Sequence, residues 1–140
     1  MEPTNFTKHT SGNPIQQTLI NNFYSTLFSE LKKLKFSSVL DVGCGEGFTL
    51  KKMEDRNLGE KLVGIDILDE ALKLGKKMHP QLDLRKGSIY KLPFKDNSFD
   101  VVMATEVLEH LEDPQKGLEE LVRVSKKYVV VSVPNEPFFI

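Results

Sequence analysis

The sequence has one cysteine, no tryptophan and three widely separated histidines among its 140 residues. A single cysteine excludes a disulfide within the chain, and the histidines do not have the spacing of zinc ligands. No apolar run approaches the ~20 residues that span a bilayer, and no basic-then-apolar signal peptide opens the chain. These absences predict a soluble, cytoplasmic protein with neither a metal site nor a membrane anchor.

The chain also lacks a charge excess of either sign, because 19 Lys and Arg residues face 20 Asp and Glu residues. A protein that neutralises nucleic-acid phosphates usually carries a basic excess, so we expect no nucleic-acid partner. The length suits one ordinary domain, and the hydrophobic share of 39% is sufficient for its core.

The first thirteen residues are polar and almost without apolar periodicity, so we expect residues 1–13 to be mobile. Asn13 and Pro14 form a typical helix start, with asparagine as the cap and proline at the first helical position. Apolar side chains then recur every three or four residues from Ile15 to Leu34, which predicts an amphipathic helix. The folded domain is therefore expected over residues 14–140.

Five short apolar runs follow, and helical stretches separate them. The predicted strands are 39–42, 62–66, 82–87, 99–104 and 128–133, and the predicted helices are 48–55, 67–78, 107–111 and 114–125. Strands that are apolar without polar alternation indicate a parallel sheet covered on both faces. Right-handed crossovers then give an open, doubly wound, Rossmann-like α/β sheet. A mixed α+β domain is the alternative.

Unusual residues follow the first strand, at the edge where such sheets bind ligands. Asp41 precedes three glycines at alternate positions, Gly43, Gly45 and Gly47. Glycines permit positive φ and leave no Cβ to block a ligand that lies against the backbone, so all three are candidate binding residues. The alternative is a tight strand-to-helix turn that binds nothing.

The loop chemistry favours a cationic ligand. A dinucleotide fingerprint would place its third glycine where this chain has Phe48. The carboxylates of Asp41 and Glu46 flank the loop, whereas a pyrophosphate prefers amides without nearby negative charge. S-adenosylmethionine carries a sulfonium and an ammonium group and no phosphate, which fits these residues.

Asp66 ends the second predicted strand, next to the glycine loop. A carboxylate there can accept hydrogen bonds from the two hydroxyls of a ribose. The alternative is that Asp66 caps the following helix, although Asp69 is also placed to do so.

Four motifs in this order resemble the class I S-adenosylmethionine-dependent methyltransferases, in the broad group that acts on small molecules, lipids and quinones. The motifs are Asp41-x-Gly43-x-Gly45-x-Gly47, Asp66, Leu92-Pro93-Phe94 before Phe99-Asp100-Val101-Val102, and the segment from Glu106 to Pro114. The resemblance runs from about Pro14 to the last residue. It implies a strand order of 3-2-1-4-5, and methyl transfer to an unidentified small-molecule acceptor that leaves S-adenosylhomocysteine.

The resemblance also implies roles around the methionine half of the cofactor. Gly43, Cys44 and Gly45 would line it through their backbones, Asp41 would face its amino group, and Thr105 would border it. Cys44 as a nucleophile is an alternative, but the acidic neighbours oppose a thiolate and favour a small filler side chain.

On the adenosine half, Asp66 would hold the ribose and Ile67 would pack on the adenine face. The family commonly has an acidic residue where this chain has Ser88, so the backbone NH of Ile89 is the second candidate for adenine. His110 is a candidate base toward an acceptor hydroxyl, or alternatively a structural residue, and the catalytic residues are not assigned.

Members of this family usually continue past the fifth strand with a helix and an antiparallel hairpin. This chain ends at Ile140, so we expect a truncated sheet that lacks the antiparallel strands. The run from Tyr128 to Val133 would then be an open edge, and we hypothesise that a second copy of the chain covers this edge and the apolar tail.

Two other functions remain open at this level. One is a module that binds S-adenosylmethionine without turnover. The other is a nicotinamide-dependent oxidoreductase, which Phe48 and the acidic loop disfavour.

Overall fold

The computed structural model describes residues 9–10, 12–133 and 136–139 and divides the chain into two compact units. The first unit is Met1–Lys35 and the second is Phe36–Ile140. Most of the segment predicted to be mobile, 1–13, lies outside the described residues. No helix in the described part of the chain is long and apolar enough to cross a membrane.

The first unit contains the helix α2 (Pro14–Leu31). The Asn13 side chain accepts hydrogen bonds from the amides of Ile15 at 2.9 Å and Gln16 at 3.2 Å, which confirms the predicted cap. The helix ends at Leu31, one turn before the last apolar residue of the predicted stripe. Apolar periodicity locates a helix better than it locates the helix end.

The second unit holds one six-stranded sheet in the order β3-β2-β1-β4-β5-β6. Its strands are β1 (Ser38–Val42), β2 (Lys61–Asp66), β3 (Asp83–Lys86), β4 (Phe99–Thr105), β5 (Ser125–Val133) and β6 (Glu136–Phe139). The first five strands pair in parallel, which confirms the predicted α/β class and the order 3-2-1-4-5. The direction of winding reverses between β1 and β4, so a ligand is expected at the carboxyl ends of these strands.

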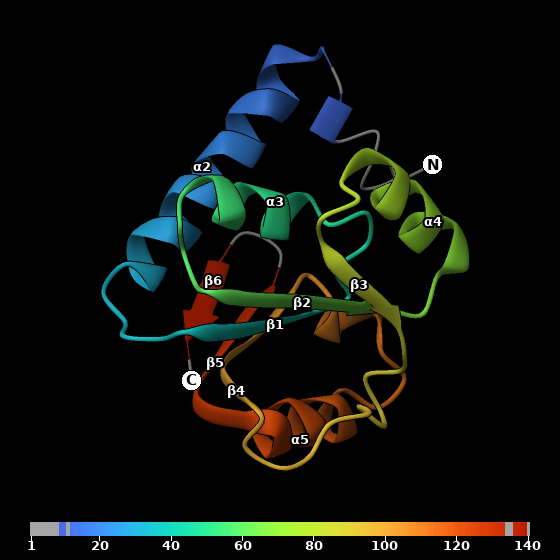
Figure 1. Ribbon diagram of the computed structural model, residues 1–140. Helices are drawn as coiled ribbons and strands as arrows, with labels where there is room; N and C mark the ends of the chain where they lie inside the picture. The colour runs from blue at the N-terminus through green and yellow to red at the C-terminus, as the bar shows by residue number, and fades with distance from the viewer. Residues whose placement is uncertain (1–8, 11, 134–135, 140) are drawn as a thin grey trace. The chain divides into compact units, whose positions relative to one another are not determined.

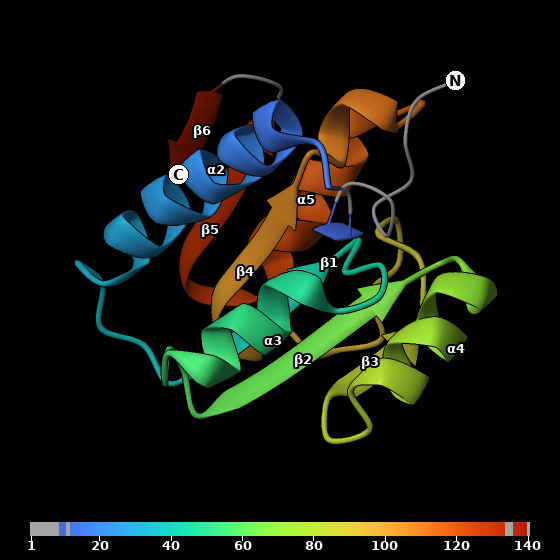
Figure 2. The ribbon, with the colours of Figure 1, turned by 90° about the horizontal axis from the view of Figure 1, so that it is seen from above.

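Helices cover both faces of this sheet. The crossover helices are α3 (Phe48–Asp55), α4 (Asp69–Met78) and α5 (Pro114–Val124), and the short 3-10 helix η1 (Leu108–His110) precedes α5. α3 and α4 lie on one face and α5 lies on the other (Figures 1 and 2). This follows because right-handed crossovers that run in opposite directions along a sheet place their helices on opposite faces.

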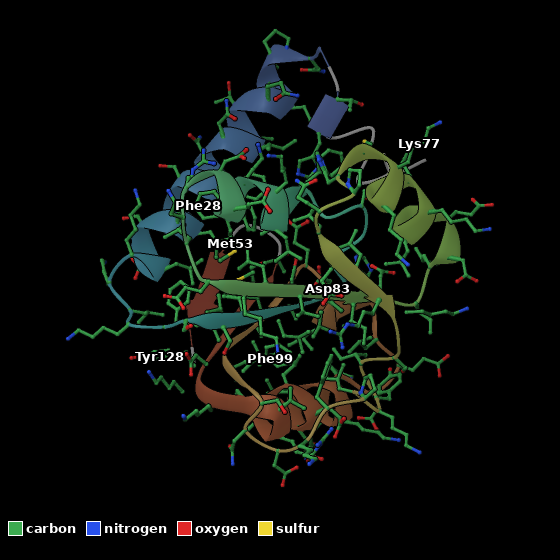
Figure 3. The ribbon with its side chains drawn as sticks, viewed as in Figure 1. Phe28, Met53, Lys77, Asp83, Phe99 and Tyr128 are labelled. Atoms are coloured by element: carbon green, nitrogen blue, oxygen red, sulfur yellow. The ribbon has the colours of Figure 1, made fainter. Side chains whose placement is uncertain are left out.

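The core therefore has two parts. Phe99 belongs to the cluster between the sheet and α5, which also contains Leu121 and Val124. Met53 of α3 is fully buried on the opposite face. Figure 3 shows Met53 and Phe99 on opposite sides of the sheet. Burial on both faces explains why the strands are apolar without alternation.

The sixth strand was not expected from the sequence. β6 pairs antiparallel with β5 over the registers Val130↔Phe139 and Val133↔Glu136. The expectation of no antiparallel strand and of an open β5 edge is therefore wrong, because the chain itself pairs with that edge. The hypothesis that a second copy of the chain covers the β5 edge therefore no longer has an open edge to rest on. Residues 134–135 and 140 of the tail lie outside the described residues.

The Leu92-Pro93-Phe94 motif is held against α5. Arg123 donates to the carbonyl oxygens of Leu92 at 2.9 Å and Phe94 at 2.8 Å, and the amide of Leu92 donates to the Glu120 carboxylate at 2.7 Å. The Glu120 and Asp96 carboxylates raise the pKa of the Arg123 guanidinium above its ordinary value. These bonds show that the motif attaches its loop to α5, a role in the fold that involves no ligand.

A close approach fixes α4 against the glycine loop. A Cβ atom added at Gly75 of α4 would lie 2.5 Å from the carbonyl oxygen of Glu46, so only glycine fits there. Gly117 of α5 is also a buried helical glycine, but its added Cβ would meet the flexible end of Leu111 at 2.6 Å. The first contact is with backbone and is rigid, whereas the second is with a side chain that can move.

Gly75→Ala should therefore destabilise the protein by about 1–3 kcal/mol, although alanine is the better helix former. Gly117→Ala is the matched control, and its cost should be clearly smaller. Urea unfolding of both variants measures the difference. An equal decrease in the free energy of unfolding for the two variants would show that the close approach to the Glu46 backbone does not make Gly75 harder to replace than Gly117.

Candidate functional site

The carboxyl ends of β1, β2 and β4 bring three predicted site residues to one edge of the sheet. Asp41 lies in β1, Asp66 ends β2 and Thr105 ends β4. β1 pairs with both neighbouring strands, with Asp41 opposite Gly64 on one side and opposite Met103 on the other. The three residues thus lie at the carboxyl ends of three neighbouring strands.

The glycine loop between β1 and α3 adopts the backbone that the sequence predicts. Gly43, Gly45 and Gly47 have φ values of +79°, +55° and +86°, in the region that favours glycine. The space beside two of them, where a side chain would lie, is filled by other side chains of the protein. Val107 occupies it at Gly43, and leucine side chains from the β3 region occupy it at Gly47.

The amides of this loop are engaged within the protein. Gly43 and Cys44 donate to the carbonyl oxygen of Ile65 at 2.8 and 3.1 Å, and Gly47 donates to that of Cys44 at 3.0 Å. The amide of Gly45 donates to Asp66 Oδ2 at 2.7 Å. These four amides are consequently not available as the phosphate-binding donors that a dinucleotide loop supplies.

The Asp66 carboxylate accepts hydrogen bonds from two segments, the glycine loop and the turn before α4. Its Oδ2 accepts from Gly45, and its Oδ1 accepts from the amide of Leu68 at 2.9 Å. The N-cap of α4 is Leu68, so the alternative that Asp66 is the cap is wrong, and Asp66 instead holds the amide of the cap residue. Asp69 pairs with Lys86 at 2.9 Å. An ionised carboxylate has about four acceptor positions, so two remain for a ligand.

Asp41 is the most perturbed acid of the edge. It is 2% exposed, and within the described part of the chain its Oδ1 atom has no hydrogen-bond partner. Burial, followed by the nearby negative charge of Asp66, raises the pKa of Asp41 to about 7. A buried acceptor without a donor is costly, so this atom marks a place where a hydrogen-bond donor would be favourable.

Cys44 has a packing role in the structure. Its side chain is 4% exposed and lies over Gly64, where an added Cβ would be 2.8 Å from Sγ. Burial and the charges of Asp41, Asp66 and Glu46 raise the pKa of the Cys44 thiol well above its ordinary value. This favours the interpretation of a small filler side chain over that of a nucleophile.

The residues predicted for adenine differ in their exposure. Ile67 follows Asp66 directly and is 58% exposed, which is unusual for a large apolar side chain next to a buried carboxylate. Ile89 is buried in the core cluster, so its side chain is not free for a ligand. The hydroxyl of Ser88 accepts from the amide of Tyr90 at 3.2 Å and keeps its own proton to donate.

The loop after β4 contains a feature that the sequence does not reveal. Glu106 has φ +55°, although glutamate has no preference for this left-handed region. His110 lies in η1, its side chain is 69% exposed, and its Nε2 is 3.7 Å from Glu109 Oε1. Its role as a base stays a prediction.

A cavity of about 670 Å³ lies elsewhere in the second unit. It opens at the amino-terminal ends of β2 and β3, and none of the predicted site residues lines it. Its lining residues are Glu54, Asn57, Gly59, Glu60, Leu62, Gln81, Leu82 and Asp83. Its position at the opposite ends of the strands separates it from the candidate site.

The raised pKa of Asp41 predicts an unusual pH dependence of stability. The folded-state value of about 7 exceeds the ordinary value of 3.8, so this residue's contribution to stability is fully present below about pH 4 and is lost as the pH rises to 7. Asp41→Asn should therefore stabilise the protein more at pH 7.5 than at pH 5, by a few kcal/mol.

Urea unfolding at the two pH values measures this difference. The control is Asp69→Asn, because the ion pair with Lys86 lowers the pKa of Asp69 and its loss should not stabilise the protein at pH 7.5. An Asp41→Asn effect of the same size at both pH values would contradict the assignment of a protonated Asp41.

Comparisons with known proteins agree with this fold. The sequence profile of the methyltransferase domain family matches residues 40–132. Demethylmenaquinone methyltransferase of Renibacterium salmoninarum is 37% identical over 103 residues, which cover 71% of this chain and 43% of that protein. A probable S-adenosylmethionine-dependent methyltransferase of Mycolicibacterium smegmatis is 33% identical over 103 residues, which cover 72% of this chain and 39% of that protein.

Among solved structures, the PH0226 protein of Pyrococcus horikoshii superposes with a TM-score of 0.74 at 23% identity. The match covers 86% of this chain and 55% of that one, and it shows the shared fold. The chain spans less than half of the length of the two relatives named above. The profile match over most of the chain, on the fold and edge described here, shows that this chain belongs to the methyltransferase domain family.

Proposed function

We propose that the chain binds S-adenosylmethionine at the carboxyl edge of β1, β2 and β4 and takes part in methyl transfer to a small molecule. The observation that carries this proposal is the hydrogen-bonding character of the edge. The loop amides donate to protein oxygens, whereas Asp41 and Asp66 offer carboxylate oxygens. A ligand that complements this edge has to donate hydrogen bonds and carry positive charge.

The groups of S-adenosylmethionine fit these requirements. Its ammonium group is a charged donor for the unpartnered Oδ1 atom of Asp41, and its ribose hydroxyls are donors for the free acceptor positions of Asp66. The pyrophosphate of a nicotinamide cofactor would meet two carboxylates and engaged amides instead. The edge therefore supports the methyltransferase cofactor over the dinucleotide.

On the methionine side, we assign the amino group to Asp41 and to carbonyl oxygens of the loop. Gly43, Cys44 and Gly45 would contribute through their backbones, and Gly47 would shape the turn into α3. Carbonyl oxygens accept from an ammonium group even though the amides are occupied. Thr105 would border this side from the end of β4.

On the adenosine side, Asp66 would hold the ribose. The exposed Ile67 side chain offers an apolar surface for the adenine ring, which would bury it. The backbone NH of Ile89 and the hydroxyl of Ser88 are the proposed donors toward the ring nitrogens.

Bound S-adenosylmethionine supplies a methyl group on a positively charged sulfur, which is a good leaving group. The chain's own residues then have to align the acceptor and exclude water more than they have to activate a nucleophile. Where the acceptor is a hydroxyl, we propose that His110 accepts its proton, since the ring is exposed on η1 beside this edge.

We propose that the methyl acceptor is a small molecule and that this 140-residue chain takes part in its methylation. One relative is a demethylmenaquinone methyltransferase, which supports a small organic acceptor such as a quinol. We assign the cofactor-binding domain to residues 14–140, with the site in the second compact unit. The second candidate is binding without turnover. Formation of S-adenosylhomocysteine with a demethylated quinol distinguishes the two.

Isothermal titration with S-adenosylhomocysteine tests the binding proposal. The chain should bind it, and Asp66→Asn should weaken binding about tenfold or more because a charged acceptor of the ribose is lost. Asp69→Asn is the control on the same turn and should bind normally, since Asp69 pairs with Lys86. Tighter binding of NAD than of S-adenosylhomocysteine would refute the proposal.

Cofactor binding should also release a proton from Asp41. A cationic ligand favours the ionised carboxylate, so the affinity for S-adenosylhomocysteine should rise between pH 6 and 7.5, where the ligand's amino group stays charged. Asp41→Asn should bind more weakly and without this pH dependence. Titrations in two buffers of different ionisation enthalpy count the proton, and a buffer-independent heat would contradict the proposed contact.

A further inference from the structure

The chain turns sharply after β4 at a residue whose type does not favour the turn. Glu106 has φ +55°, and a residue with a Cβ atom in this region costs about 1–2 kcal/mol. Such a conformation persists only where neighbouring groups hold it, and it is concentrated at functional sites. Here it lies directly after Thr105, at the edge described above.

Ser132 holds this turn with two acceptors. The amide of Glu106 donates to the carbonyl oxygen of Ser132 at 3.0 Å and to its hydroxyl oxygen at 3.1 Å. Ser132 is 2% exposed and pairs with Thr105 in the register between β4 and β5. The carbonyl bond belongs to ordinary strand pairing, whereas the hydroxyl bond is an addition that alanine would remove.

The turn at Glu106 places Val107 over the glycine loop. A Cβ atom added at Gly43 would lie 2.5 Å from Val107 Cγ2, so this methyl group occupies the space beside the glycine. Ser132, Glu106, Val107 and Gly43 thus form one continuous chain of contacts from the end of β5 to the end of β1. A shift of the turn would be transmitted to the loop.

We propose that Ser132 is a positioning residue for the methionine half of the cofactor, because its hydroxyl keeps Val107 seated on Gly43. The inference rests on the proposed function, in which Gly43 and Thr105 border that half. The adenosine half depends on Asp66 and Ile67 at the end of β2, on the other side of β1. Loss of the Ser132 hydroxyl should therefore weaken the contacts to the methionine half of the cofactor and leave the contacts to the adenosine half unchanged.

The test compares two ligands on the full chain. S-adenosylhomocysteine contains both halves, whereas 5′-methylthioadenosine lacks the amino-acid portion. Ser132→Ala should weaken the binding of S-adenosylhomocysteine about three- to tenfold and leave the affinity for methylthioadenosine unchanged. Ser132→Thr, which keeps the hydroxyl, should restore most of the affinity. Ser125→Ala is the matched control, since Ser125 is at the opposite end of β5 and donates to Val122.

A second variant separates positioning from loss of stability. Glycine adopts the left-handed conformation without a Cβ penalty, so Ser132→Ala should cost less affinity in a Glu106→Gly background. Equal weakening of both ligands, or no weakening of either, would overturn the inference while the proposed function stands. Failure of the unsubstituted chain to bind S-adenosylhomocysteine would overturn the proposed function itself.

Discussion

The hydrogen bond from the Gly45 amide to Asp66 Oδ2 joins the glycine loop to the neighbouring strand and sets the character of the whole edge. It fixes the loop without any ligand. It also occupies an amide that a phosphate-binding loop would leave free, and it holds a carboxylate beside Asp41. The loop consequently resembles a dinucleotide loop in its glycines but presents acceptors where a dinucleotide site presents donors.

This arrangement lowers the stability of the protein near neutral pH. The burial of Asp41, followed by the nearby charge of Asp66, raises the pKa of Asp41 to about 7, so that ionised Asp41 is disfavoured in the folded protein. An apolar residue at position 41 would remove that cost. No group of the described residues donates to the Oδ1 atom of Asp41, so a hydrogen-bond donor at this place would be favourable.

Sequence reasoning located the features that depend on local chemistry. The cap at Asn13, the strand order and the backbone of the glycine loop follow from residue type and spacing, and the structure has them. It failed for β6, because the two residues between β5 and β6 are Pro134 and Asn135 and lack the Asn-Gly signal of a tight hairpin. Pairing with an available strand edge outweighed the missing turn signal.

The reason for glycine at position 43 shows why the remaining features could not be predicted. Its positive φ is a local property, but the contact that excludes a side chain comes from Val107, 64 residues later in the chain. Val107 reaches it only because Glu106 is held in a left-handed turn by Ser132, a residue of another strand. The carboxyl edge of the sheet is thus held by contacts near in sequence on the β2 side and by contacts between distant segments on the β4 side. A change in β5 can therefore alter the β4 side while the β2 side keeps its geometry.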